Sequence, residues 1–295
     1  MSFNELQGVY IVAVSGGVDS VVLLDMLTRE GQVTGSEFIV AHFDHGIRPD
    51  SALDAQFVAQ LAINKNLPFI TERAELGEDV SEDKAREARY EFLRRVKNQY
   101  SARAIITAHH QDDVLETIAM HLLRGAGRQG LDPMRRTLDI ERPLLGYPKA
   151  AMYKTAHEQG LKWRHDSTND DSRYFRNKIR KLYTTFDPGS RKALLELHAR
   201  VKAINDEIDV LLKVINEWTL NDAHIVRSRF VQLPYVIQKE VVHSWLQQNN
   251  IYDFDKSQVE RIVLAAKTLA IGKKLDINNA YWLKSTQTSL RILRK

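Results

Sequence analysis

The sequence VYIVAVSGGVDSVVLL occupies residues 9–24, and it decides the fold class of the chain. It opens with six apolar residues, rich in β-branched types, as is typical of a buried strand in a parallel sheet. The apolar residues from Val21 to Leu27 predict a helix directly after it. A strand, a short turn and a helix in this order indicate an α/β protein.

The turn between this strand and helix is suited to binding phosphate. Gly16 and Gly17 have no Cβ, so the backbone can take positive φ angles and approach a ligand closely. Backbone amides, the hydroxyls of Ser15 and Ser20, and the start of the helix can then face one anion together. Asp19 is useful at such a place when Mg²⁺ accompanies a nucleotide, because the ion reverses the sign of the local electrostatics.

This turn lacks the Gly-Lys-Ser of a P-loop and the Gly-x-Gly-x-x-Gly of a dinucleotide fold. A chance Gly-Gly turn is the plain alternative. The pattern Ser-Gly-Gly-x-Asp-Ser after a buried strand resembles the pyrophosphate loop of the N-type ATP pyrophosphatases, which cleave ATP to AMP and pyrophosphate while adenylating a carbonyl-type oxygen. The resemblance implies that the phosphates are held by Ser15, Gly16, Gly17, Val18, Asp19 and Ser20, with Asp19 also holding Mg²⁺.

Composition narrows the class of protein. The chain has 295 residues, 43% of them hydrophobic, and this length predicts one large domain and a smaller one. The absence of cysteine excludes disulfides, cysteine metal sites and thiol nucleophiles in this chain. No targeting segment opens the sequence, and no apolar run approaches the roughly 18 residues of a membrane span. We therefore expect a cytoplasmic protein that does not bind membranes.

A second strand is predicted at residues 38–41, after a loop predicted at residues 31–35. It leads into a polar run, HFDHGIR, at residues 42–48. The carboxyl ends of the strands line the ligand crevice of an open α/β sheet, so we expect this run to face the nucleotide. A solvated loop is the alternative, and the spacing of the histidines matches no common zinc pattern.

A further strand, residues 102–108, leads into the sequence HHQDDVLET at residues 109–117. Helical geometry from about Asp112 puts Asp113 and Glu116 on one stripe, and turns Leu122 toward the core. Two carboxylates one turn apart at the mouth of the sheet indicate a cationic ligand or a metal. The alternative is the ordinary preference for acidic residues at a helix N-terminus.

Two basic segments follow. Residues 124–130 form a glycine-rich loop, which we expect to order on a substrate. Residues 173–181 interleave five basic residues with aromatic ones, a combination that can pair with phosphates while a ring stacks on a base. A solvated helix face is the alternative for this second segment.

A turn containing Asp-Pro-Gly-Ser predicts a domain boundary, dividing the chain into residues 1–186 and 187–295. Beyond it, the apolar periodicity predicts a long helix from residue 191 to about 220. Two more helices are expected near residues 234–248 and 256–269, followed by short strands. We therefore expect an α/β domain with a Rossmann-like parallel sheet and a smaller, mainly helical C-terminal domain.

Taken in order, these motifs resemble the tRNA(Ile)-lysidine synthetase family over most of residues 8–181. The matching segments are residues 15–20, 42–48, 109–117, 124–130, 142–145 and 166–180. The resemblance implies that residues 1–186 are the pyrophosphatase-type catalytic domain and that residues 187–295 bind or support tRNA. We expect the further C-terminal domain of longer family members to be absent here.

The resemblance also implies the reaction. ATP, with Mg²⁺, adenylates the C2 oxygen of the wobble cytidine in the CAU anticodon of an isoleucine tRNA, and the ε-amine of free L-lysine then attacks C2 and releases AMP. Catalytic roles are implied for Asp19, Asp44, His45, Asp113 and Glu116, the last two binding the lysine, while Ala41 and His42 flank the nucleotide. Contacts to tRNA or to developing charge are implied for Arg124, Arg173, Arg176, Asn177 and Arg180.

Two other functions fit part of the sequence. A tRNA-thiolating member of the same superfamily would need cysteines to carry sulfur, and this chain has none. A nucleotide-regulated RNA-binding protein without chemistry would explain the basic block, but it gives no reason for the pair Asp113 and Glu116. The sequence leaves open whether the protein acts as a homodimer.

Overall fold

The computed structural model describes residues 6–46, 51–77, 80–123, 125, 127–135, 139–164, 178–180, 182, 185–222, 224–251 and 254–295. The chain forms two compact units, Met1–Val201 and Lys202–Lys295. The limit between these units lies inside helix α7 (Pro188–Thr219), and the domain limits of 1–186 and 187–295 stay a prediction. Within the described ranges, no helix is long and apolar enough to cross a membrane.

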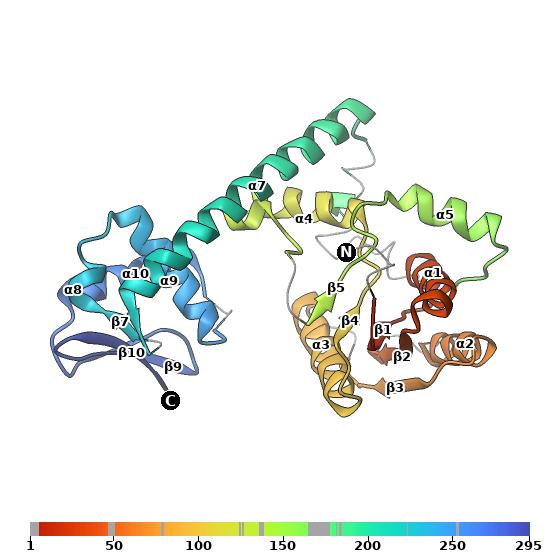
Figure 1. Cartoon of the computed structure of the whole chain (residues 1–295), viewed down its shortest axis with the longest axis horizontal. Coiled ribbons are helices and arrows are strands. Elements are labelled where there is room, and N and C mark those ends of the chain that lie inside the picture. Colours follow the sequence, from red (N-terminus) through yellow and green to blue (C-terminus); the bar gives the residue numbers. More distant parts are fainter. Residues whose placement is uncertain are drawn as a thin grey trace. The chain divides into compact units, whose positions relative to one another are not determined.

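The first unit is built on a five-stranded parallel sheet of order β3-β2-β1-β4-β5 (Figure 1). Its strands are β1 (Val9–Ala13), β2 (Glu37–Asp44), β3 (Phe69–Arg73), β4 (Ala104–Ile106) and β5 (Ile140–Glu141). Strand order reverses at β1, the point where ligands bind in open α/β sheets. The predicted Rossmann-like α/β fold is confirmed.

Helices cover both faces of this sheet, which explains why β1 is apolar on both sides. Tyr10 and Val12 face a core shared with α1 (Val18–Thr34), α2 (Ser51–Asn64) and α5 (Lys149–Glu158). Ile11 faces the opposite core, which α3 (Glu82–Gln99) closes. Helix α4 (Gln111–Leu123) and the short 3-10 helix η2 (Arg128–Leu131) follow β4.

Two predictions about local structure were wrong. The expected loop at residues 31–35 is the last turn of α1, which ends at Gly35 in the left-handed conformation (φ +70°). Gly31 lies inside the helix, and the position requires glycine because the ring of Phe38 occupies the space where a Cβ would lie. Leu122, expected to face the core, is 47% exposed.

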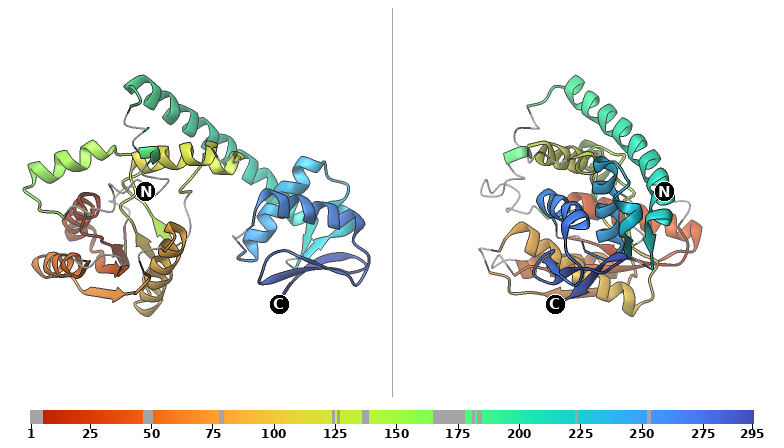
Figure 2. Two further views of the ribbon diagram at one scale, coloured as in Figure 1. Left: turned by 180° about the vertical axis from the view of Figure 1, so that it is seen from behind. Right: turned by 90° about the vertical axis from the view of Figure 1, so that its left-hand side faces the viewer.

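The second unit combines helices with an antiparallel sheet of order β6-β7-β10-β9-β8. Its strands are β6 (Leu220–Asn221), β7 (His224–Val226), β8 (Lys274–Asp276), β9 (Tyr281–Ser285) and β10 (Ser289–Arg294). Helices α8 (Arg227–Phe230), α9 (Tyr235–Gln248) and α10 (Lys256–Thr268) lie on one side of strands β8 to β10 (Figures 1 and 2). The predicted helices and the terminal short strands are confirmed.

Candidate active site

The turn after β1 has the geometry of an anion site. Gly16 has a φ of +92°, which a residue with a side chain rarely adopts. The Ser20 hydroxyl accepts hydrogen bonds from the amides of Ser15 and Gly16, both at 3.2 Å, and donates to the Gly17 carbonyl at 2.9 Å. Gly17 caps α1 without a side-chain hydrogen bond. The first amides of α1 therefore remain directed at an incoming anion.

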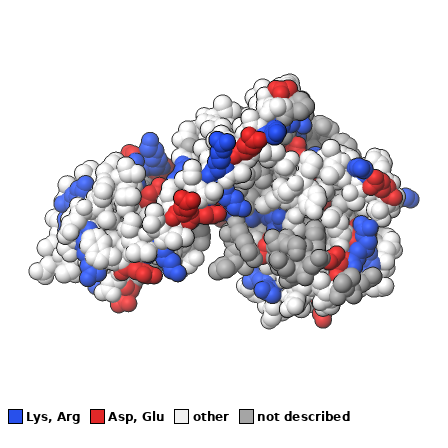
Figure 3. All heavy atoms as spheres, turned by 45° about the horizontal axis from the view of Figure 1, so that its top comes forward, with Lys and Arg blue, Asp and Glu red and all other residues white. Residues whose placement is uncertain are grey.

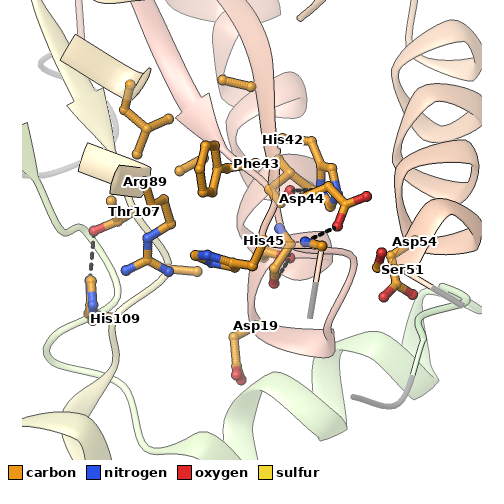
Figure 4. A pocket seen from close by; sticks show the side chains of 18 residues that line it. Asp19, His42, Phe43, Asp44, His45, Ser51, Asp54, Arg89, Thr107 and His109 are labelled. Atoms are coloured by element: carbon orange, nitrogen blue, oxygen red, sulfur yellow. Dashed lines mark hydrogen bonds between the residues drawn. The ribbon is translucent and has the colours of Figure 1, made fainter. Parts of the chain in front are cut away.

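A cavity of about 320 Å³ opens beside this turn, at the carboxyl ends of β1, β2 and β4 (Figure 4). That volume lies at the lower end of the range for small-molecule pockets. Seven residues predicted from the sequence line the cavity: Ser15, Asp19, Ser20, Ala41, His42, Asp44 and His45. Gly16, Gly17 and Val18 are not among the residues that line it; Val18 packs into the core instead.

The polar run after β2 forms one wall of the cavity. His42 is buried, and its Nδ1 lies 2.8 Å from the carbonyl oxygen of Val14. Burial lowers the pKa of His42, so the ring is neutral and donates from Nδ1 to that carbonyl. The Asp44 carboxylate accepts from the amide of Gly46 at 2.9 Å. The ring of His45 packs edge-on against Phe43, with 4.8 Å between centroids. These contacts fix the orientations of the His42, Asp44 and His45 side chains that form this wall of the cavity.

Asp19 lies at the edge of the cavity, on the first turn of α1. Its Oδ2 is 3.5 Å from Nζ of Lys149 and 3.7 Å from Nε2 of His110. Its Oδ1 is buried and has no hydrogen-bond partner in the structure. Such an oxygen fits a hard cation such as Mg²⁺, which is commonly bound by one or two carboxylates together with substrate phosphates. Among the described residues, no group of three acidic or histidine side chains could hold a metal alone.

His110 connects Asp19 to the acidic start of α4. Its Nε2 lies 3.4 Å from Oδ2 of Asp113, and its backbone amide donates to the same oxygen at 2.9 Å. The imidazole therefore lies between the carboxylates of Asp19 and Asp113. The turn from Ser15 to Ser20, His110 and the start of α4 with Asp113 and Glu116 consequently form one continuous rim at the carboxyl edge of the sheet.

Glu116, one turn further along α4, is buried and paired with Arg180. Nε of Arg180 donates to Oε1 at 2.8 Å, and Nη2 donates to Oε2 at 3.2 Å. Burial opposes the charge of Arg180, but the hydrogen bond and charge of Glu116 outweigh it and raise the guanidinium pKa. A bidentate pair of this kind fixes both side chains. Two residues with different predicted roles thus contact each other directly.

His109 closes the far wall of the cavity. Its Nδ1 lies 2.8 Å from the hydroxyl of Thr107, and the side chain of Arg89 lines the same space (Figure 4). Desolvation is the main cause that lowers the pKa of His109 to about 3, and nearby arginines lower it further. The ring is therefore neutral at physiological pH.

Several residues of the site were not predicted as functional. Arg164 donates through its backbone amide to the Gly16 carbonyl at 3.0 Å, while its guanidinium pairs with Asp54. Asp54 and Ser51 line the cavity together with Thr107, and Lys149 reaches Asp19 from α5. The one sequence signal was the crowding of polar residues around Ser51 and Asp54 at the start of α2. Four predicted site residues lie outside the described residues: Arg124, Arg173, Arg176 and Asn177.

Comparison with known proteins agrees with this geometry. Residues 3–185 match the PP-loop domain family, so the fold and the glycine-containing turn after β1 define a PP-loop protein. Among solved structures, a U34-tRNA thiolase from Methanococcus maripaludis has the same fold, with a TM-score of 0.55 and 18% identity over 65% of this chain and 72% of that one.

Curated relatives narrow the class. A tRNA(Ile)-lysidine synthase of Streptococcus thermophilus is 30% identical over 99% of this chain and 68% of its own length, and one from Synechococcus is 30% identical over 85% and 80%. The chain belongs to the tRNA(Ile)-lysidine synthase family. The synthase of Thermus thermophilus is 42% identical over 177 residues, and the chain spans about a third of that relative's length (34%).

Proposed function

We propose that the protein joins L-lysine to C2 of the wobble cytidine of a CAU-anticodon isoleucine tRNA, using ATP. The family to which the chain belongs supports this reaction, because its members carry that activity in their name. The single observation that carries the proposal is the position of His110 between Asp19 and Asp113, at 3.7 Å and 3.4 Å from their carboxylates. It joins a phosphate site to a site for a cationic amine.

The phosphate end of the rim serves the first step. The C2 oxygen of cytidine attacks the α-phosphorus of ATP, a new oxygen–phosphorus bond forms, and pyrophosphate leaves. The turn from Ser15 to Ser20 holds the phosphates through backbone amides and the start of α1. The Asp19 carboxylate would hold Mg²⁺ together with the phosphates, and the ion would neutralise charge on the phosphate oxygens. Asp44 and His45 flank the nucleotide and the reacting base.

The acidic end serves the second step. The ε-amine of lysine attacks C2, the bond from C2 to oxygen breaks, AMP leaves, and the proton of the amine passes to solvent. Asp113 and Glu116 bind the lysine, and a charge-assisted contact to its ammonium contributes roughly 1.5–3 kcal/mol. Because Glu116 already pairs with Arg180, we assign the larger share to Asp113. His109, with a pKa of about 3, is too weak a base to remove the proton and serves as a neutral hydrogen-bonding group.

The tRNA is held by basic residues of both parts of the chain. Arg180, already oriented by Glu116, is proposed to stabilise developing charge, and Arg124, Arg173, Arg176 and Asn177 are proposed to contact tRNA. The C-terminal part, residues 187–295, is proposed to bind or support tRNA. We place the activity in the cytoplasm, where tRNA, ATP and free lysine are all present.

The test is incorporation of labelled lysine into a transcript of the isoleucine tRNA, with ATP and Mg²⁺. The elongator methionine tRNA, which also has a CAU anticodon, is the control. The proposal predicts incorporation into the isoleucine tRNA alone, with one AMP released per lysine. Release of AMP and pyrophosphate without lysine incorporation would leave the adenylating step intact and refute the choice of nucleophile or tRNA.

The variant Asp113→Asn tests the lysine assignment. Loss of a contact worth roughly 1.5–3 kcal/mol predicts that kcat/KM for lysine falls by about 10-fold to 150-fold, because the ammonium loses its charged partner. ATP binding, measured by isothermal calorimetry, should stay largely unchanged. An unchanged lysine KM and kcat would remove Asp113 from the lysine site.

A further inference from the structure

The outer face of the antiparallel sheet in the second unit carries a row of cations. Register places Lys274 of β8 opposite Lys284 of β9, and Lys284 opposite Arg291 of β10. Residues directly opposite on antiparallel strands point to the same face. Neighbouring strands are about 4.8 Å apart, so the row extends about 10 Å across three strands.

The row faces away from the core. Leu275, Leu283 and Ile292 form the next row of the register, and all three belong to the hydrophobic core of this unit. Side chains alternate between the two faces of a sheet, so the three cations lie on the other face. Helices α8, α9 and α10 lie on the core side of these strands (Figure 2). Lys274 and Arg291 are exposed, and Lys284 is partly exposed.

Among the residues that the structure describes, no carboxylate forms an ion pair with Lys274, Lys284 or Arg291. Within residues 254–295, which the structure describes without a gap, no acidic side chain lies within ion-pair distance of Lys274, Lys284 or Arg291. Asp276 is the one acidic residue among residues 269–295, against six lysines and arginines. Its carboxylate already binds Nζ of Lys295 at 2.6 Å and Nε1 of Trp282 at 2.7 Å.

A structural reason accounts for Lys274, whose Nζ lies 3.9 Å from the centroid of the Trp282 ring in a cation–π contact, but not for Lys284 or Arg291. Lysines on edge strands protect a sheet from aggregation, but of the three strands that carry the row only β8 is at an edge of the sheet. Lys284 and Arg291 are on interior strands, where like charges directly opposite each other destabilise the sheet. On the face of the molecule drawn in Figure 3, by contrast, acidic and basic side chains are interspersed. An unneutralised row therefore indicates an anionic partner.

We propose that Lys274, Lys284 and Arg291 bind the phosphate backbone of the RNA substrate. A line of cations about 10 Å long on an open sheet face suits consecutive phosphates, and such contacts carry affinity rather than base specificity. The proposal rests on the proposed function only for the identity of the RNA. It gives the second unit a defined RNA-binding surface, separate from the rim of the first unit.

The experiment compares two variants of the full chain that lose the same charge. The row variant is Lys274→Gln/Lys284→Gln/Arg291→Gln, and the control is Lys202→Gln/Lys213→Gln/Lys256→Gln, at exposed helical positions off the sheet. Affinity for the isoleucine tRNA transcript is measured by fluorescence anisotropy over a series of KCl concentrations. Circular dichroism verifies that both variants fold.

The row variant should bind at least about tenfold more weakly at low salt. Its slope of log K against log salt should be shallower by about 3, because each phosphate contact accounts for roughly one unit. The control should lose less than about one unit. A charge-retaining variant, Lys274→Arg/Lys284→Arg, should bind as the unchanged protein does.

Equal losses in the row and control variants, or no loss in the row variant, would overturn the proposal and point to a different acidic partner. Lysine incorporation by the same unchanged protein separates the two hypotheses. If the unchanged protein binds tRNA without incorporating lysine, the proposed function fails, while the salt dependence of the row and control variants still tests the phosphate contacts. If it incorporates lysine and the variants do not differ, only the row fails.

Discussion

The two five-stranded sheets present polar residues in opposite ways. The parallel sheet is covered by helices on both faces, so its candidate site residues collect at the carboxyl edge, where the strands end. The antiparallel sheet has a core on one side only, and its cations lie across the open face. Charges at the rim are buried or partly buried and contact one another, whereas those on the face are exposed or partly exposed, and we propose that they act additively. Single substitutions should therefore have large effects at the rim and small ones on the face.

The largest effect is expected for Asp19→Asn. The change removes the charge beside the phosphate turn and leaves Lys149 and His110 without their carboxylate. Turnover should fall by about 10²-fold to 10³-fold, the usual loss when one electrostatic contact to a developing charge is removed. Asp25→Asn is the matched control, because Asp25 is on the same helix but pairs with Lys65 and Arg29. Equal turnover in the two variants would contradict a special role for Asp19.

Glu116→Gln tests whether charges at the rim are interlocked. Glu116 is 3% exposed and Arg180 28%, so the change leaves a mostly buried guanidinium without its charged partner. We expect the free energy of unfolding to fall by about 1–3 kcal/mol, less than for a fully buried pair because Arg180 remains partly solvated.

Urea unfolding measures this loss, and the double variant Glu116→Gln/Arg180→Met should recover part of it. Glu196→Gln, in the exposed pair with Lys192, should cause no measurable change. If Glu116→Gln and Glu196→Gln behave alike, the pair is not coupled to the fold.

A pH effect of smaller size is expected from His109. Its pKa is lowered to about 3 in the folded protein, so between pH 3 and about 6.5 only the unfolded chain binds this proton. The contribution of neutral His109 to the free energy of unfolding is therefore fully present above pH 6.5 and is lost as the pH falls from 6.5 toward 3. From pH 7 to pH 5 the unchanged protein should lose about 1–2 kcal/mol more than His109→Asn. The pKa of His42 is also lowered, but His42 is present in both proteins, so its contribution cancels in the comparison. If the free energy of unfolding of the two proteins changes with pH in parallel, His109 has no such effect.

The smallest effect is expected on the open sheet face. Lys284→Gln removes one exposed phosphate contact, so tRNA affinity should fall less than about threefold and the salt slope by about 1. Anisotropy titrations at several salt concentrations measure both quantities. A loss as large as that of Asp19→Asn would show that the face is not a set of additive contacts.

The sequence predicted which segments form the rim, but it did not predict which of their residues contact each other. The turn from Ser15 to Ser20, the parallel sheet and the helices follow from local patterns of apolar residues and glycines. The contacts of Lys149 with Asp19 and of Arg164 with Gly16 join residues 130 and 148 positions apart in the chain. Periodicity carries no information on such pairs, because tertiary packing determines them.

The same limit explains the errors and the missed surface. Gly31 is a glycine because Phe38 packs against it and not because a loop begins there, and no local signal indicates that contact. Lys274, Lys284 and Arg291 come from three strands, and only their register places them side by side. The pairing of Glu116 with Arg180 likewise brings together two predicted site residues 64 positions apart.

The central claim is that the rim of the parallel sheet is one site for both nucleotide and lysine. Its most direct test is a crystal structure of the chain with a non-hydrolysable ATP analogue, Mg²⁺ and L-lysine. We predict the phosphates on the turn from Ser15 to Ser20, the metal on Asp19, and the lysine ammonium within hydrogen-bonding distance of Asp113. Lysine bound elsewhere, with Asp113 contacting only His110, would contradict the account.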